Sequence, residues 1–248
     1  MNQRAPIGFS QLIKRTWLDF TARKKLEGQT STEIRAALND FLSDEVSVGS
    51  IYHNSSRRKI ISILLKVWVN VPQPQQLFRD EGLLLFKHKP ESIAVHWGMA
   101  MAVYPFFALV AKNVGRLLRL QNHVSMAQLH KRLREKMGER DTVIAATRKL
   151  IRCWVEWGVL ADTDKKGIYT ATDLQPITDA QLTTWLLEAA LIANEGQSAV
   201  LHTLVNYTPT LFPFTLSSNY FIPNERLEMF NQGVNEISVT FSNYQIQS

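Results

Sequence analysis

The sequence has little of the chemistry that most enzymes and secreted proteins need. Its 248 residues include one cysteine, Cys153, so no disulfide can form within the chain and a cytoplasmic protein is expected. No CxxC pair is present, and none of the six histidines is spaced with a carboxylate as metal ligands are. Walker, GxGxxG and GxSxG motifs are missing as well. We therefore predict a protein that is not an enzyme and needs no metal or cofactor.

Apolar runs long enough to cross a membrane are also scarce. Residues 1–15 lack the apolar core of a secretion signal. The longest apolar run, 93–111, approaches the roughly 20 residues of a membrane span, but it contains His96, Gly98 and Pro105. Proline suits the first turn of a helix, so this run predicts two buried helices that meet at Pro105, and no membrane partner.

Charge is unevenly distributed along the chain. Residues 171–248 contain seven acids but one basic residue, Arg226, whereas residues 1–170 contain 27 basic and 15 acidic residues, a net charge of +12. A basic segment of this size favours a polyanionic partner such as nucleic acid. The acidic segment predicts a contact with a different partner.

The N-terminal part predicts a series of helices. Apolar spacing indicates an amphipathic helix over 8–26 and a second over about 31–43, where Thr30 or Ser31 and Glu33 can form a capping box. A third helix follows the cap at 54–56. It carries Arg57, Arg58 and Lys59 in its first turn, where cations oppose the helix dipole. Such a placement is sometimes retained because an anion binds nearby, and sometimes has no functional meaning.

Residues 125–171 form the most informative unit. The pattern predicts a helix from Ser125 to about 136, a turn at 138–141, and a second helix over about 142–157 that ends at Gly158. Two strands, 159–163 and 168–171, follow around the hairpin turn 164–167. This order of elements is typical of the winged helix-turn-helix, in which the second helix enters the major groove and the hairpin touches the DNA backbone.

The basic residues of this unit predict how DNA would be held. Arg148 and Arg152 lie one turn apart on the expected outer face of the second helix, where arginine can hold a phosphate or contact guanine. Winged helices also serve as protein-interaction modules, and an exposed basic face is often only solvated, so shape does not settle function. The candidate nucleic-acid-binding residues are Arg57, Arg58, Lys59, Lys131, Arg132, Thr142, Arg148, Lys149, Arg152, Lys165 and Lys166.

The C-terminal part predicts a mixed region. Helices are expected over 179–193 and 197–206, and strands over 214–218 and 237–241 around a short helix at 224–230. Helices followed by strands could form a second, degenerate winged helix. Because this region has almost no cations, the preferred interpretation is a surface that docks another protein subunit.

The order of these parts resembles the BREX A family, small helical subunits of bacterial phage-exclusion systems. The shared features are the N-terminal helical pair, the serine- and arginine-rich helix start at 54–58, the alanine-rich central helix at 93–111, and the helix-turn-helix ending in 158–160. The resemblance covers roughly residues 30–190 as a pattern rather than as residue identity. It implies a non-enzymatic DNA-binding accessory subunit of an antiphage defence system.

Together these observations predict a mainly α, multi-helix protein that contains a winged helix-turn-helix and a few short strands, in the wing hairpin and near the C-terminus. The predicted domains are an N-terminal helical domain (1–122), the winged-helix unit (123–175) and an acidic interaction region (176–248). The leading hypothesis is double-stranded DNA binding through the basic face. The alternatives are a scaffold subunit without a nucleic-acid role and a winged-helix transcriptional regulator, which would be a two-fold dimer with strong sequence preference.

Overall fold

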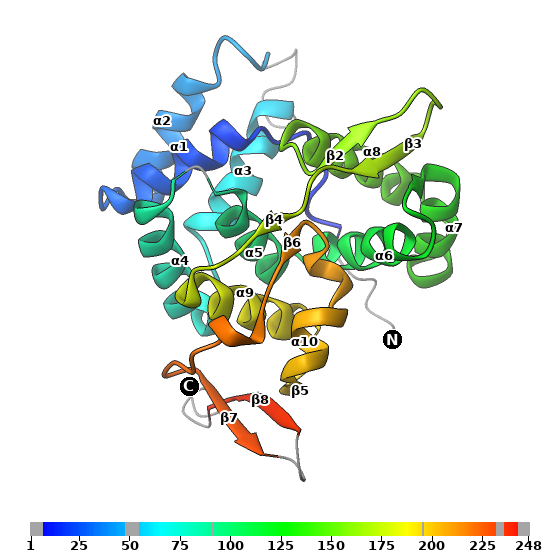
Figure 1. Ribbon diagram of the computed structural model, residues 1–248. Helices are drawn as coiled ribbons and strands as arrows, with labels where there is room; N and C mark the ends of the chain where they lie inside the picture. Colours follow the sequence, from blue (N-terminus) through cyan, green and yellow to red (C-terminus); the bar gives the residue numbers. More distant parts are fainter. Residues whose placement is uncertain (1–6, 48–54, 91, 195, 232–235, 243–248) are drawn as a thin grey trace.

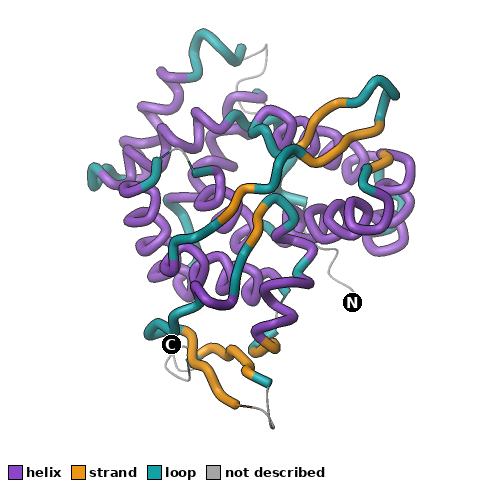
Figure 2. The backbone as a smooth tube through the Cα atoms, viewed as in Figure 1, coloured by secondary structure: helices purple, strands orange, loops and turns teal. Residues whose placement is uncertain are grey.

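Helices make up most of the chain, as Figure 2 shows. The computed structural model describes residues 7–47, 55–90, 92–194, 196–231 and 236–242. The prediction of a mainly helical protein with a few short strands is confirmed. The helices within the described residues are α1 (Arg15–Leu26), α2 (Ser31–Phe41), α3 (Ser56–Trp68), α4 (Gln76–His88), α5 (Ile93–Val103), α6 (Pro105–Gln121), α7 (Met126–Met137), α8 (Asp141–Glu156), α9 (Ala180–Ala193) and α10 (Leu201–Tyr207).

The short strands form three small sheets. Strands β1 (Val124–Ser125), β2 (Leu160–Asp162) and β3 (Ile168–Ala171) form an antiparallel sheet in the order β1-β3-β2. The second such sheet has the order β5-β8-β7, formed by β5 (Ser198–Val200), β7 (Leu227–Asn231) and β8 (Ile237–Phe241). A parallel pair joins β4 (Gln175–Pro176) to β6 (Phe214–Thr215). In each antiparallel sheet the strand that comes last in the sequence, β3 or β8, is the central strand.

The apolar run at 93–111 forms two buried helices, as the sequence predicts. Every residue of α5 is buried, and α6 begins at Pro105. Within the described residues, no single helix is both long and apolar enough to cross a membrane. α5 and α6 pass that test only as a pair, and they meet at 117°.

Helix α9 packs into the same core as α4 and α5. The indole ring of Trp185 stacks on Phe78 with the ring centroids 4.4 Å apart, and its Nε1 donates a hydrogen bond to the Phe78 carbonyl oxygen. A Cβ at Gly98 would lie 2.2 Å from this ring, so only glycine permits the close approach of the two helices. Residues that precede and residues that follow the segment 123–175 therefore share one core.

An aromatic cluster attaches α8 to that core. The Trp97 ring on α5 lies 4.9 Å from both Phe107 on α6 and Trp154 on α8, measured between ring centroids. Trp97 Nε1 also donates to the Thr210 carbonyl oxygen. Burying large aromatic rings contributes strongly to stability, so the buried face of α8 is firmly anchored.

His96 lies in the core with both of its ring nitrogens hydrogen-bonded. His96 Nδ1 accepts a hydrogen bond from Trp68 Nε1 at 3.1 Å, so the proton of the neutral ring is on Nε2, which donates to Asp19 at 2.8 Å. Burial lowers the pKa of His96, and the opposing effect of Asp19 is smaller. The sequence interpretation of His96 as a structural core residue is confirmed.

His96 should make the fold sensitive to acid. Because its pKa is lower in the folded state than its ordinary value of 6.5, the unfolded chain binds the proton first as the pH falls. We expect the free energy of unfolding to fall below pH 6.5 by up to about 1.4 kcal/mol per pH unit from this group. Urea unfolding at pH 7.5, 6.5 and 5.5 measures the slope. The variant H96Q keeps a hydrogen-bond donor toward Asp19 but has no titrating ring, so its free energy of unfolding should depend less steeply on pH. Equal slopes in the two proteins would contradict the role of His96 in the acid sensitivity.

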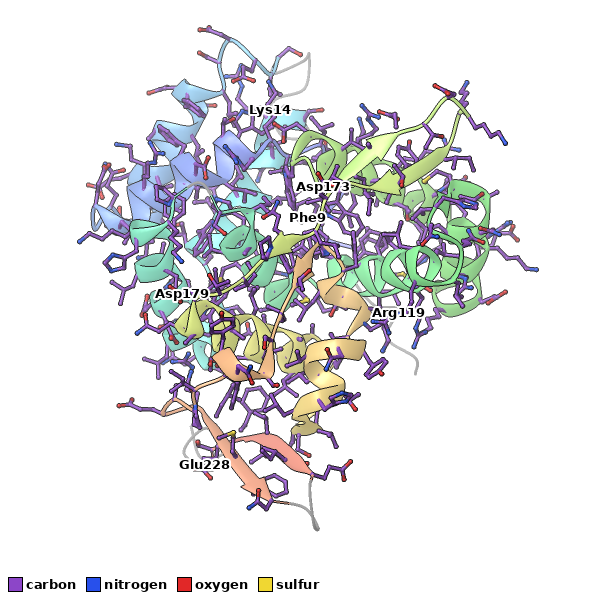
Figure 3. All side chains as sticks on the ribbon, viewed as in Figure 1. Phe9, Lys14, Arg119, Asp173, Asp179 and Glu228 are labelled. Atoms are coloured by element: carbon purple, nitrogen blue, oxygen red, sulfur yellow. The ribbon has the colours of Figure 1, made fainter. Side chains whose placement is uncertain are left out.

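The first helix is shorter than the sequence predicts. Helical spacing over 8–26 predicts one helix, but α1 begins at Arg15 and residues 7–14 are not helical. The backbone of this segment bonds to α8 instead: Ile13 N donates to Cys153 Sγ, and the Ile13 carbonyl accepts from Trp157 Nε1. Phe9, labelled in Figure 3, is fully buried against the rings of Tyr104, Phe107 and Trp157. Tertiary packing therefore overrides the local helical pattern.

The C-terminal region corrects two other expectations. Residues 227–231 form strand β7 rather than a helix, although Leu227, Glu228 and Met229 all favour helices. Asn224 Oδ1 accepts from the backbone N–H groups of Arg226 and Leu227, a turn that directs the chain into pairing with β8. The helix expected at 197–206 begins only at Leu201, after the strand β5.

Candidate nucleic-acid interface

Helix α8 presents one apolar and one basic face. Its inner face, which includes Val143, Ala146, Leu150 and Trp154, is buried, as predicted. Along the opposite face the exposed residues are Thr142, Ala145, Arg148, Lys149, Arg152 and Glu156. Gly158 ends the helix in a left-handed conformation, at φ 71°, and β2 begins two residues later. Figure 1 shows the β2–β3 hairpin projecting from the body of the molecule beside α8.

Arg152 is not free to project toward a ligand. Its Nη1 donates to both carboxylate oxygens of Asp162 on β2, at 2.9 and 2.7 Å. Hydrogen bonding to Asp162 raises the pKa of Arg152 further. The guanidinium group therefore joins the helix to the hairpin. Its positive charge is partly neutralised within the molecule, so its role differs from the one the sequence hypothesis gave it.

Arg148 and Lys149 remain as the exposed cations of α8 that make no ion pair among the described residues, and α7 adds further cations beside them. Burial lowers the pKa of His130 on α7, and the charges of Arg148 and Arg134 lower it further. Arg134 pairs with the exposed Glu139 at 3.1 Å. The α8 basic surface, as we define it, consists of Arg148 and Lys149 with His130 and Arg134 beside them.

The two lysines of the hairpin turn, Lys165 and Lys166, are exposed at its tip. Their turn is fixed from within, because Thr163 Oγ1 accepts from Lys165 N and donates to the Ile168 carbonyl oxygen. β3 also pairs with β1, which precedes α7. The hairpin is therefore held on both sides, by β1 and by the Arg152–Asp162 pair.

Lys131 and Arg132 lie on a different face of α7 from His130 and Arg134. Together with Glu135 they line a groove of about 360 Å³ against Leu117 and Leu120 of α6. The structure therefore does not bring these two predicted residues together with the α8 basic surface.

The three predicted residues of α3 also lie away from the α8 basic surface, and one of them is buried. Arg57 is buried: its Nε donates to the Val46 carbonyl at 2.8 Å and its Nη2 to the Ser43 carbonyl at 3.1 Å. It ties α3 to the turn after α2, and we do not retain it as a contact to nucleic acid. Arg58 and Lys59 are exposed and line a separate cavity. Ser55 caps α3 by accepting from Arg58 N, whereas Asn54 lies outside the described residues.

Several cations were missed by the sequence hypothesis. Burial lowers the pKa of Lys112 on α6, and the positive charges of Arg116 on α6 and Lys136 on α7 lower it further. The spacing of four residues between Lys112 and Arg116, and between His130 and Arg134, was the available signal, since such pairs share a helix face. Contact between α6 and α7 could not be inferred from spacing alone.

The described residues hold neither a reactive thiol nor a cluster of metal ligands. Cys153 is fully buried beneath the 7–14 segment, and burial raises the pKa of its thiol to about 12, so a reactive thiolate does not form near neutral pH. No group of three or more His, Cys, Asp or Glu side chains in the described part of the chain could hold a metal ion. Comparisons with protein-family models, with curated proteins and with solved structures find no match to this chain.

Proposed function

We propose that this protein is a non-enzymatic accessory subunit that binds the backbone of double-stranded DNA. In this proposal β1, α7, α8, β2 and β3 act as a winged helix-turn-helix. The observation that carries it is the exposure of Arg148 and Lys149 on a helix whose other face is anchored in the core, beside a hairpin tipped by Lys165 and Lys166. Rigid placement of cations is what repeated phosphate contact requires, and phosphate contacts supply most non-specific affinity.

The helix geometry favours backbone contact over base reading. Arg152, the second arginine of the outer face, is held by Asp162, which leaves Arg148 as the one arginine of α8 not in an ion pair that the structure describes. Base-specific contact to guanine needs both donors of a well-placed arginine. We therefore expect low sequence preference, which argues against the transcriptional regulator.

The C-terminal region would serve a different partner. Its sheet β5-β8-β7 carries the exposed Glu228, and the exposed Glu236 directly precedes β8. In Figure 1 β7 and β8 lie at the opposite end of the molecule from the β2–β3 hairpin. An acidic surface so far from α8 would not repel DNA bound there. We propose that this end docks another protein subunit. The setting in an antiphage defence complex is carried by the family resemblance alone.

Fluorescence anisotropy with a labelled 25-base-pair duplex tests the proposal across a salt series. Four phosphate contacts, from Arg148, Lys149, Lys165 and Lys166, predict a slope of about −3 to −4 for the logarithm of affinity against the logarithm of salt concentration. Single-stranded DNA and RNA of equal length serve as comparisons. Duplex binding that is undetectable at 50 mM salt would favour the scaffold, a reading that the internal pairing of Arg134 and Arg152 supports.

A further inference from the structure

A cavity of about 400 Å³ lies along one face of α3, and the charged residues that line it within the described part of the chain are all cationic. The residues that line it are Gly8, Ser10, Arg58, Lys59, Ser62, Ile63, Lys66 and Tyr104. No carboxylate is among these residues. None of them belongs to α7, α8 or the hairpin, so the α3 cavity is a site separate from the α8 basic surface.

The cations around the α3 cavity gather without acidic neighbours in sequence. Arg58, Ser62 and Lys66 follow one another at intervals of four residues and so share a helix face, with Lys59 beside them. Residues 46–79 contain five basic residues and no acidic one. Positive groups around one cavity repel each other, and a bound anion would remove that repulsion.

The walls of the α3 cavity are held in place. Gly8, at φ 59°, lets the 7–14 segment approach Tyr104 closely, because a Cβ there would lie 2.7 Å from the ring. Phe9, next to it, is fully buried. Lys66 Nζ lies 4.6 Å from the centroid of the Tyr104 ring, an attraction that fixes the ammonium group at the cavity. The Lys66 ammonium group is therefore placed at the cavity before any ligand arrives.

We propose that the α3 cavity is a phosphate-binding site, with Lys59 and Lys66 as its principal cations. Ammonium and guanidinium groups form short, strong hydrogen bonds to phosphate oxygens, and several such groups around one cavity suit a doubly charged phosphate. The phosphate group can come from a small phosphorylated molecule or from a nucleic-acid backbone. This inference does not rest on the proposed function of α8.

Isothermal titration calorimetry with inorganic pyrophosphate at 50 mM salt tests for a free ligand, and anisotropy with the 25-base-pair duplex tests for a backbone. The variant K59A/K66A removes two cations that are not buried, so the fold should be retained. The variant K25A/K87A removes the same charge outside both sites and is the matched control. Thermal unfolding of each variant checks that the chain remains folded.

We expect K59A/K66A to weaken pyrophosphate binding at least ten-fold while K25A/K87A leaves it unchanged, which would assign the cavity to a free phosphorylated ligand. A ten-fold loss confined to the duplex would assign it to backbone phosphate. Equal affinities of the two variants for both probes would overturn the proposal. A variant with α8 reversed in charge, R148E/K149E, should keep pyrophosphate binding, so failure of one site is distinguishable from failure of the other.

Discussion

Reversing the charge of Arg148 and Lys149 together should weaken duplex binding roughly 100-fold at 100 mM salt. Both side chains are exposed on α8, so R148E/K149E removes two phosphate contacts and adds two repulsive charges without disturbing the core. The salt dependence should weaken as well, with the slope of the logarithmic plot reduced by about two. Anisotropy over 50–300 mM salt gives both quantities.

The matched control for that experiment reverses two charges elsewhere. K25E/K87E makes the same change in net charge on α1 and α4, away from α7, α8 and the hairpin. It should reduce affinity only through the weaker overall attraction, by much less than R148E/K149E. Equal losses in the two variants would mean that net charge rather than a defined surface holds the duplex, and the assignment to α8 would be wrong. Arg152 is unsuited to this test, because its loss would also release Asp162 and the hairpin.

Replacing Arg226 with alanine should destabilise the fold by about 3–5 kcal/mol. Arg226 is the one basic residue in 171–248, and its guanidinium group lies between two carboxylates. It donates from Nε and Nη2 to Glu188, at 2.7 and 2.8 Å, and also to Glu81. The side chain of Glu188 is 1% exposed, so R226A leaves a buried carboxylate without its counter-ion. Urea unfolding at pH 7 measures the change.

The pH dependence of R226A tests whether the unpaired Glu188 carboxylate causes the loss of stability. Burial already raises the pKa of Glu188, and loss of the opposing arginine should raise it more. The folded variant then binds a proton that the unfolded chain does not, so the stability that it loses relative to the parent protein should shrink as the pH falls from 7 toward 4.5, while the His96 contribution is common to both proteins. The double variant R226A/E188Q should recover part of the stability and lose this pH dependence. A midpoint of unfolding unchanged by R226A would contradict the role given to the pair.

Some site features follow directly from local sequence. The outer face of α8 could be predicted because apolar residues at 143, 146, 150 and 154 repeat at the helical period, which places Arg148 and Lys149 on the other side. The hairpin was predictable because two short β-prone stretches flank a polar turn ending in glycine. Both are decided by interactions within about 20 residues of chain.

Other features needed contacts that no local pattern encodes. The sequence placed Arg57 and Arg152 among the ligand contacts, but Arg57 donates to carbonyl groups of 43 and 46, and Arg152 pairs across the hairpin with Asp162. The α3 cavity forms only because the 7–14 segment leaves the helical conformation its spacing predicts and packs beside Tyr104.

The sequence by itself determined the helical class, the amphipathic faces and the separation of a basic segment from an acidic one, because periodicity and charge are properties of neighbouring residues. The tertiary structure decided which cations stay exposed, since burial and pairing depend on residues distant in the chain. It also decided that residues 227–231 form a strand, because hydrogen bonding to β8 outweighs their helix propensity. The proposed DNA contact therefore rests on Arg148 and Lys149, which sequence and structure both place at the surface.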